Sequence, residues 1–349
     1  MSKIALISDL HLGVKKSDKT FLDNQMNFLY NEFVPYLKNN NINMIAILGD
    51  LFDTRNTLNI FMVSKAFRFF EYLKEQNIFV YIFQGNHDTY FKTTNEVHSL
   101  NFLKKFDNVC LIEDIELKEI EKRKLLFVPW VVNNEDFKKR VANKNLHCDV
   151  CFGHFDIVGF PLNNTTICQE GLETSLFLNN YTLTFSGHFH KRSTYKIKDR
   201  EIIMIGSPYQ ITRNDKGDER GFCILDLETL TYEFVNSNRT IKFIDLKYPE
   251  KFTSEQILGN VIDVYVNYNG NDLIDKELQK YVQGIEEYNP AYPPNIFMNN
   301  TLFDGVENDI KIKSLSEMID DFIDNLQIDN KNEIKDIINE LYSKSKSSE

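Results

Sequence analysis

The segment Asn43–Asp53, with the sequence NMIAILGDLFD, joins a short apolar run to a turn that carries two carboxylates. The run Asn43–Leu48 has the length and composition of a buried strand. A stretch with helical spacing follows at Thr57–Gln76, and the next apolar run lies at Ile78–Phe83. Strands that alternate with helical stretches predict a layered α/β core.

The same arrangement, an apolar run that ends in a polar turn, occurs five times in the first two thirds of the chain. The other four runs are Lys3–Ser8 before Asp9 and His11, Ile78–Gln84 before Asn86 and His87, Asp149–Phe152 before His154, and Thr182–Ser186 before His188 and His190. Of the 7 histidines, only His98 and His147 lie outside these turns. Because ligands of α/β sheets bind outside the carboxyl ends of the strands, we expect all five turns to meet at one edge.

The side chains in these turns favour a pair of divalent metal ions. Imidazole, carboxylate and amide groups suit ions such as manganese, iron or zinc. In an extended segment the residues i and i+2 project to the same side, so His188 and His190 can each serve a different ion. A carboxylate can bridge two ions about 3.5–4 Å apart, and such a pair promotes displacement at phosphorus.

The five turns, in this order, resemble the D-x-H, G-D-x-x-D, G-N-H-[DE], G-H and G-H-x-H pattern of the calcineurin-like metallophosphoesterase superfamily. The resemblance spans roughly Ile4–Leu225 and implies a layered β-sandwich flanked by helices. It implies one ion held by Asp9, His11, Asp50 and His190, and a second held by Asp50, Asn86, His154 and His188, with Asp50 bridging. It also implies that His87 contacts the scissile phosphate or protonates the leaving oxygen, and that Asp53 orients His87.

Further segments narrow the resemblance to one branch of the superfamily. DLHLG, GDLFD, GNHD, VPW at Val128–Trp130 and the stretch Ile205–Asp226 are similar to the SbcD/Mre-type DNA repair nucleases. Phosphoprotein phosphatases carry the motifs GDxxDRG and RGNHE, whereas Thr54-Arg55 and Gln84 depart from these arginine positions here. The length and the Asn/Lys/Ile-rich composition resemble recombination endonuclease subunits of T-even-like phages.

This branch implies a two-metal DNA exonuclease and endonuclease that uses manganese, with magnesium as the alternative. It also implies a homodimer and a partner, an SbcC-type coiled-coil ATPase that binds the C-terminal helices. We expect three parts, namely a nuclease domain at residues 1–235, a small α+β capping domain at 236–300 and a helical partner-binding segment at 301–349. The apolar stripe of the last segment, which follows a capping box at Ser314–Glu317, could instead pack on the nuclease domain as ordinary core.

Composition excludes some classes of protein. No apolar run approaches the roughly 20 residues of a membrane helix, and we expect a cytoplasmic protein, in the host cytoplasm if a phage encodes it. Five irregularly spaced cysteines indicate thiols, and the pair Cys148 and Cys151 fits a strand better than a zinc site. The net charge of −11 does not favour long-range attraction to DNA, and we expect Arg213, Lys216 and Arg220 to lie in a solvated loop.

Three alternatives remain open from the residues alone. A small-molecule phosphodiesterase or phosphatase would use the same metal ligands but would leave the C-terminal helices unexplained. A non-catalytic scaffold on the same fold would be expected to have lost ligands, and no ligand of the pattern is missing here. Asp53 could simply cap the following helix.

Overall fold

The computed structural model describes residues 3–142, 146, 148–162, 166–237, 239–268, 272–289, 292–300 and 335. The expected partner-binding segment, residues 301–349, therefore lies outside the described residues except for Lys335.

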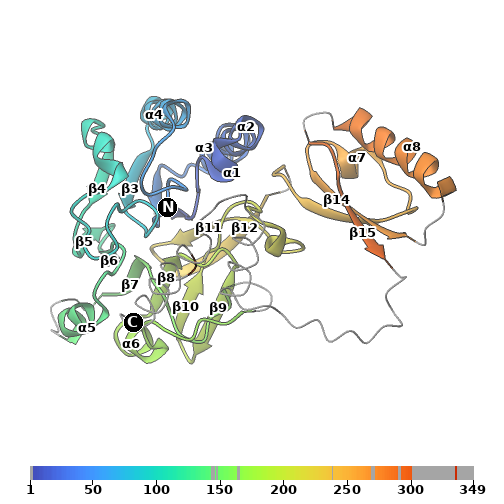
Figure 1. The fold of residues 1–349 in the computed structure, drawn as a ribbon. Coiled ribbons are helices and arrows are strands. Elements are labelled where there is room, and N and C mark those ends of the chain that lie inside the picture. Colours follow the sequence, from blue (N-terminus) through green and yellow to red (C-terminus); the bar gives the residue numbers. More distant parts are fainter. Residues whose placement is uncertain are drawn as a thin grey trace. The chain divides into compact units, whose positions relative to one another are not determined.

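Two six-stranded sheets form the centre of the first part of the chain (Figure 1). The first sheet has the order β12 (Thr231–Asn236), β11 (Gly221–Asp226), β1 (Lys3–Ile7), β2 (Met44–Ile47), β3 (Phe79–Phe83) and β4 (Val109–Ile112). The second has the order β5 (Glu116–Ile120), β6 (Arg123–Val128), β7 (Val150–His154), β8 (Leu183–Gly187), β10 (Arg200–Met204) and β9 (Ser193–Ile197). In the first sheet β1 to β4 are parallel, and in the second β6, β7, β8 and β10 are parallel.

The side chains of β1 show how the layers are packed. Ile4 and Leu6 belong to a core cluster shared with Phe127 and Phe152 of the second sheet. Ala5 and Ile7 point to the opposite face, where the core includes residues of the surrounding helices. Since both faces of the strand are buried, its sequence is apolar without alternation, as expected for a parallel strand covered on both sides.

Helices cover the outer face of each sheet and complete a four-layer sandwich (Figure 1). On the first sheet these are α1 (Val14–Ser17), α2 (Lys19–Phe28), the π-helix Leu29–Phe33, α3 (Val34–Asn39) and α4 (Ile60–Glu75). On the second they are α5 (Asn134–Ala142) and α6 (Thr174–Asn180). Short 3₁₀ helices lie at Ser99–Lys105 and Arg213–Asp215. The predicted layered sandwich is confirmed.

The helix boundaries differ from the sequence prediction where local chemistry intervenes. The helical stretch around Thr20–Lys38 is divided by a π-helical turn, and Pro35 stands in the first turn of α3, where its missing N–H is tolerated. The helix expected from Thr57 begins at Ile60, because the Asn59 side chain accepts a hydrogen bond from the Phe61 N–H at 2.8 Å and caps it.

A three-stranded sheet follows the sandwich in the sequence. Its order is β13 (Phe243–Lys247), β14 (Val261–Tyr268) and β15 (Asn295–Asn300), and it packs with α7 (Ser254–Ile257) and α8 (Asp272–Tyr288) around a separate core. These elements agree with the small α+β module expected after residue 235, although the three-part division itself stays a prediction.

The expectation that Arg213, Lys216 and Arg220 lie in a solvated loop is wrong for Arg220 and incomplete for the other two, since Arg213 is 44% exposed but is also paired. Arg213 and Lys216 both pair with Asp263 of β14, at 2.7 Å and 2.9 Å, and the Asp263 side chain is fully buried. Arg220 is itself only 4% exposed and pairs with Asp215 at 2.9 Å. These cations are therefore part of the packing, because each compensates a buried or half-buried carboxylate.

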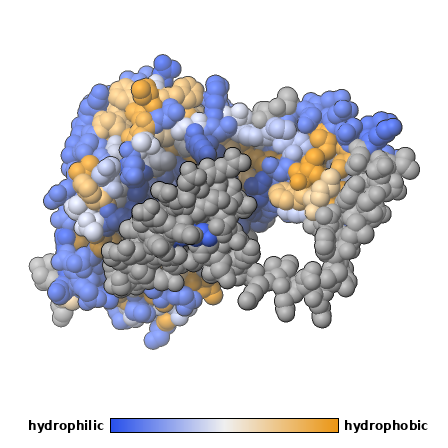
Figure 2. All heavy atoms as spheres, in the orientation of Figure 1, coloured by the Kyte–Doolittle hydropathy of each residue, from blue (hydrophilic) through white to orange (hydrophobic). Residues whose placement is uncertain are grey.

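The surface is largely hydrophilic, with apolar side chains gathered at a few places that include the face over α4 (Figure 2). Ile60 and Phe61, at the start of that helix, are 87% and 42% exposed. Within the part of the chain that the structure describes, none of the helices has the length and apolar character needed to cross a bilayer.

Candidate metal centre

The five polar turns meet, but they come from two sheets rather than from one. The turns after β1, β2 and β3 belong to the first sheet, and those at the ends of β7 and β8 belong to the second. Contacts such as that between His11 and His190, whose Nε2 atoms are 3.0 Å apart, join the two sets. The edge predicted from the sequence is thus the common end of a sandwich, where the carboxyl ends of both groups of parallel strands come together.

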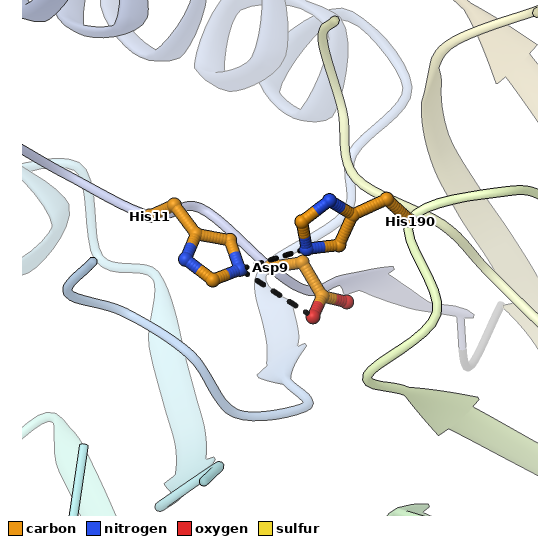
Figure 3. A group of neighbouring side chains, drawn as sticks. All are labelled: Asp9, His11 and His190. Carbon is orange, nitrogen blue, oxygen red and sulfur yellow. Dashed lines mark hydrogen bonds and ion pairs between the residues drawn. The ribbon is translucent and has the colours of Figure 1, made fainter. Parts of the chain in front are cut away.

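One group of side chains gathers around His11 (Figure 3). Its Nε2 atom lies 3.0 Å from His190 Nε2, 3.9 Å from Asp9 Oδ1 and 3.5 Å from Asp50 Oδ2. His11, Asp9 and Asp50 are almost fully buried. Ligand atoms of Asp9, His11 and His190 therefore lie within 4.8 Å of one another, as ligands of a cation do, and Asp50 lies next to His11.

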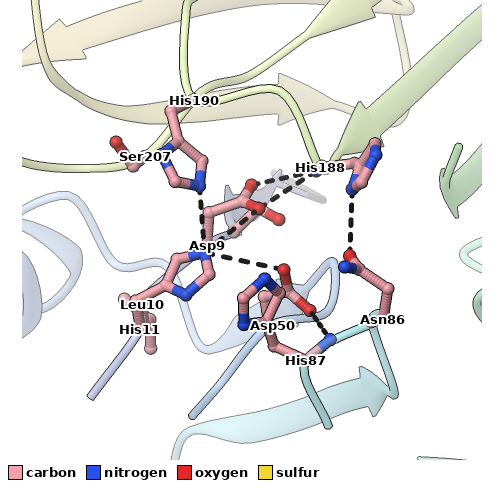
Figure 4. A network of polar contacts seen from close by, with 12 residues as sticks. Asp9, Leu10, His11, Asp50, Asn86, His87, His188, His190 and Ser207 are labelled. Carbon is pink, nitrogen blue, oxygen red and sulfur yellow. Dashed lines mark hydrogen bonds and ion pairs between the residues drawn. The ribbon is translucent and has the colours of Figure 1, made fainter. Parts of the chain in front are cut away.

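A second group gathers around the amide of Asn86 (Figure 4). Its Oδ1 atom lies 2.9 Å from His154 Nε2 and 2.9 Å from His188 Nδ1. Asp50 Oδ2 is 3.4 Å from the same His154 nitrogen. His154 Nδ1 is 2.8 Å from the Leu48 carbonyl oxygen and donates to it, which leaves Nε2 free for a ligand role.

Asp50 belongs to both groups. Its Oδ2 atom faces His11 and His154, and its Oδ1 atom accepts a hydrogen bond from the His87 N–H at 2.8 Å. Burial alone would raise the pKa of Asp50, but the charge and hydrogen bond of His154 and the charge of His11 lower it overall. The carboxylate is therefore ionised and oriented at the point where the two groups meet.

Four of the clustered residues have backbone conformations that L-amino acids rarely adopt. The φ angles are +54° at Asp9, +41° at His11, +53° at Asp50 and +89° at His188. A residue without glycine's freedom adopts a positive φ only when the surrounding structure holds it there, and such residues concentrate at functional sites. This geometry supports a functional role for the turns independently of their composition.

The glycines of the turns allow the strand ends to approach one another. A Cβ atom on Gly187 would lie 2.5 Å from the Leu48 carbonyl oxygen and 2.9 Å from His154 Nδ1. A Cβ atom on Gly85 would lie 2.5 Å from the Asp50 backbone nitrogen. No side chain fits at these distances, so only glycine permits the observed separation of the turns.

His87 and Asp53 lie beside the two groups, with a contact that differs from the expected one. His87 Nδ1 donates to the backbone carbonyl oxygen of Asp53 at 2.6 Å. The Asp53 carboxylate instead faces His11, with 3.3 Å between Oδ1 and Nδ1. In this structure Asp53 thus orients His87 through its main chain and His11 through its side chain. The His87 ring also packs edge-on against His11, with 4.7 Å between ring centroids.

The surroundings raise the pKa of His154 and His11 but lower the pKa of His190. Burial would lower the pKa of His154, but Asp50 outweighs it and raises the pKa to about 9. Burial also opposes the rise at His11, whose pKa is raised overall by Asp53, Asp50 and Asp9. The pKa of His190 is lowered, because burial and the nearby charge of His11 both disfavour its protonated form.

A family model for calcineurin-like phosphoesterases matches residues 2–192, which is more than half of the chain. The chain belongs to the calcineurin-like phosphoesterase family. This family membership confirms the resemblance found from the five turns, all of which start within the matched region.

Three curated proteins are similar to this phosphoesterase. Exonuclease subunit 1 of Enterobacteria phage T4 is 26% identical over 325 residues, which cover 92% of each chain. The DNA double-strand break repair protein Mre11 of Nanoarchaeum equitans is 22% identical and covers 75% of this chain and 77% of its own. Putative phosphoesterase 078R of Invertebrate iridescent virus 3 is 25% identical and covers 46% of this chain and 49% of its own.

The donor atoms of the phosphoesterase site fit two divalent metal ions. Imidazole nitrogens, carboxylate oxygens and one amide oxygen form the donor set, which divalent ions of the manganese, iron or zinc type accept. The closest contacts between donors measure 2.9 to 3.9 Å, and the His and Asp donors of each group lie within 4.8 Å of one another, as atoms around a common centre do. The roles of individual residues as ligands remain proposals.

The sequence analysis missed several residues that shape the site. Asp88 accepts hydrogen bonds from the N–H groups of Leu51, Phe52 and Gly85, and so ties two of the turns together. Burial and the charge of Asp50 raise the pKa of Asp88 to about 7. The available signal was its position directly after His87, because the motif G-N-H-[DE] ends in an acidic residue.

Two further neighbours, Trp130 and Arg220, were named from the sequence but were not placed at the site. The Trp130 ring lies 5.1 Å from that of His188, between ring centroids. The Arg220 guanidinium donates to the backbone carbonyl oxygen of His190 and to Ser207 Oγ. Both come from segments distant in the sequence, so only the tertiary fold places them here.

Proposed function

We propose that this phosphoesterase is a two-metal DNA nuclease, an exonuclease and endonuclease that forms the catalytic subunit of an SbcCD-like repair and recombination complex. The observation that carries the proposal is the position of Asp50 Oδ2, which lies within 3.5 Å of a histidine of each ligand group. Similarity to T4 exonuclease subunit 1 along nearly the whole chain supports DNA as the substrate.

In this proposal, Asp9, His11, Asp50 and His190 hold one ion, and Asp50, Asn86, His154 and His188 hold the other. Two such ions, most favourably manganese with magnesium as the alternative, would supply a nucleophilic water at neutral pH and would neutralise charge at phosphorus. The protein contributes the fixed positions of these ligands, since the strained turns leave them little freedom.

His87 supplies the proton chemistry. Its Nδ1 proton is held by the Asp53 carbonyl oxygen, so Nε2 is the nitrogen left to face substrate. From there His87 contacts the scissile phosphate or donates a proton to the leaving oxygen. Asp53 is thus a positioning residue for His87 through the main chain.

A nuclease assay tests the function. The purified chain is incubated with linear duplex DNA and, separately, with a chromogenic phosphodiester, with and without manganese. We expect manganese-dependent loss of DNA that disappears in His188→Ala. His98→Asn is the matched control, because His98 contacts Glu113 outside the two ligand groups. Hydrolysis of the small ester with DNA left intact, alone and with an SbcC-type partner, would replace the nuclease by a small-molecule phosphodiesterase.

We also propose a partner and a second copy. The SbcC-type ATPase would bind residues 301–349, and a chain shortened after residue 300 should then keep ester hydrolysis but fail to bind the ATPase. The homodimer would cover apolar surface such as the exposed start of α4, and the mass in solution should therefore fall to that of one chain in Ile60→Asp. A cytoplasmic location, in the host if a phage encodes the chain, belongs to the same proposal.

A further inference from the structure

The two ring nitrogens of His188 have different partners. Nδ1 lies 2.9 Å from Asn86 Oδ1, inside the second ligand group. Nε2 lies 2.7 Å from Oδ1 of Asp156, outside that group. A carboxylate accepts but does not donate when ionised, so Nε2 carries the proton in this contact and Nδ1 presents its lone pair to the ligand group.

We propose that Asp156 is a positioning residue for the second metal ion, acting through the His188 ring. The inference rests on the two-metal function proposed above and adds to it a residue outside the ligand pattern. Carboxylates that accept the second N–H of a ligating histidine fix its tautomer and ring orientation and raise its basicity. Asp156 stands in that relation to His188.

Other contacts fix the main chain of His188 but do not determine which ring atom faces the metal site. The His188 N–H donates to both carboxylate oxygens of Asp9, at 3.1 Å each, and this keeps the residue at its positive φ. Trp130 packs against one side of the ring. A half-turn of the ring about its bond to Cβ would replace Nδ1 by a carbon atom at the metal site, and neither contact opposes that. The hydrogen bond to Asp156 does oppose it.

The backbone around Asp156 is built to keep its carboxylate in place. The Leu172 N–H donates to the Asp156 carbonyl oxygen at 2.8 Å, and Ile157 pairs with Leu172 in a short bridge. Gly171, with φ of +141°, passes so close that a Cβ atom there would lie 2.5 Å from the same carbonyl oxygen. On the other side, the Phe155 N–H donates to Ser186 Oγ of β8, two residues before His188. Asp156 and His188 are therefore anchored to neighbouring strands.

The test measures manganese binding by titration calorimetry rather than catalysis. The variants are Asp156→Asn, Asp156→Glu and the control Asp149→Asn. Asp149 precedes the same strand, β7, and its side chain is 40% exposed against 39% for Asp156. We expect Asp156→Asn to lower the affinity for one of the two manganese ions by about 10–100-fold and to leave the affinity for the other unchanged. Asp156→Glu should recover part of the loss, since it keeps a negatively charged acceptor, whereas the Asn amide oxygen accepts without the charge.

A structural role alone would give a different result. Asp156 is partly exposed, so its loss should leave the Tm of the metal-free protein close to that of the wild type. The inference is overturned if Asp156→Asn binds both ions as the wild type does, or weakens both equally together with a fall in metal-free Tm. A wild-type chain that binds fewer than two manganese ions would instead overturn the two-metal proposal itself, and the two failures are thereby distinguished.

Discussion

Manganese binding should strengthen with pH well above neutrality, and His154 is the physical reason. Asp50 raises the pKa of this buried histidine to about 9 in the metal-free protein. A metal ion needs the neutral ring with its Nε2 lone pair free, so binding below pH 9 must displace a proton. Because half of the rings are still protonated at pH 9, binding at pH 7 should be about 50-fold weaker than at pH 9, or weaker by about 2 kcal/mol.

The same group gives the metal-free fold an opposite pH dependence. The pKa of His154 is higher in the folded state than the 6.5 of an ordinary histidine. Its contribution to the free energy of unfolding is therefore complete below pH 6.5 and is lost as the pH rises to 9. The raised pKa of His11 acts in the same direction. The metal-free protein should melt at a lower temperature at pH 9 than at pH 6.5.

Calorimetry in buffers of different ionisation enthalpy measures both the affinity and the number of protons released. We expect affinity to rise between pH 7 and 9 and the apparent binding enthalpy to depend on the buffer. His154→Asn has no titrating ring and should release about one proton fewer when manganese binds. His98→Asn should release as many protons as the wild type. An affinity that is flat over this range, with no buffer dependence, would refute the argument that Asp50 holds a proton on His154.

Three further predictions address catalysis, backbone space and packing. His87→Asn should lower the rate of ester hydrolysis by about 10²–10⁴-fold with manganese affinity unchanged, because His87 lies beside the ligand groups rather than within them. Gly187→Ala should destabilise the fold by about 1–3 kcal/mol and weaken manganese binding, as measured by denaturation and calorimetry, because its Cβ would press on Leu48 and His154. Phe152→Ala, in the core between the sheets, should cost about 3–5 kcal/mol in urea unfolding without moving the metal ligands.

The order of helices and strands could be predicted from the sequence. The strands are buried on both faces, so each one appears as a short apolar run. Lys3–Ile7 and Met44–Ile47 are short apolar runs that each end in a polar turn, and the structure places a parallel strand at each. The sequence did not show that the five turns are shared between two sheets. That depends on strand pairing between distant segments, such as β1 with β11, which no local pattern encodes.

The side-chain geometry of the site was predictable only in part. Residue types and spacing were enough to nominate Asp50 and the histidines, because metal ligation depends on a few atom types. They could not show that the Asp53 carboxylate faces His11 while its carbonyl oxygen holds His87, since both contacts arise from the path of one turn. Nor could they show that Arg220 is buried, because its hydrogen bonds to Ser207 and to the His190 carbonyl oxygen join segments that are apart in the sequence.

The acidic net charge of −11 and a polyanionic substrate are compatible because the charge that meets phosphate is local. Beyond a Debye length of about 8 Å in physiological salt, the surface carboxylates of the chain are largely screened. At the metal centre, the positive charge of two divalent ions would exceed the negative charge of the buried carboxylates Asp9 and Asp50. Removal of the metal should therefore abolish phosphate binding as well as hydrolysis. An affinity for DNA that survives chelation must come from other surfaces or from the proposed ATPase partner.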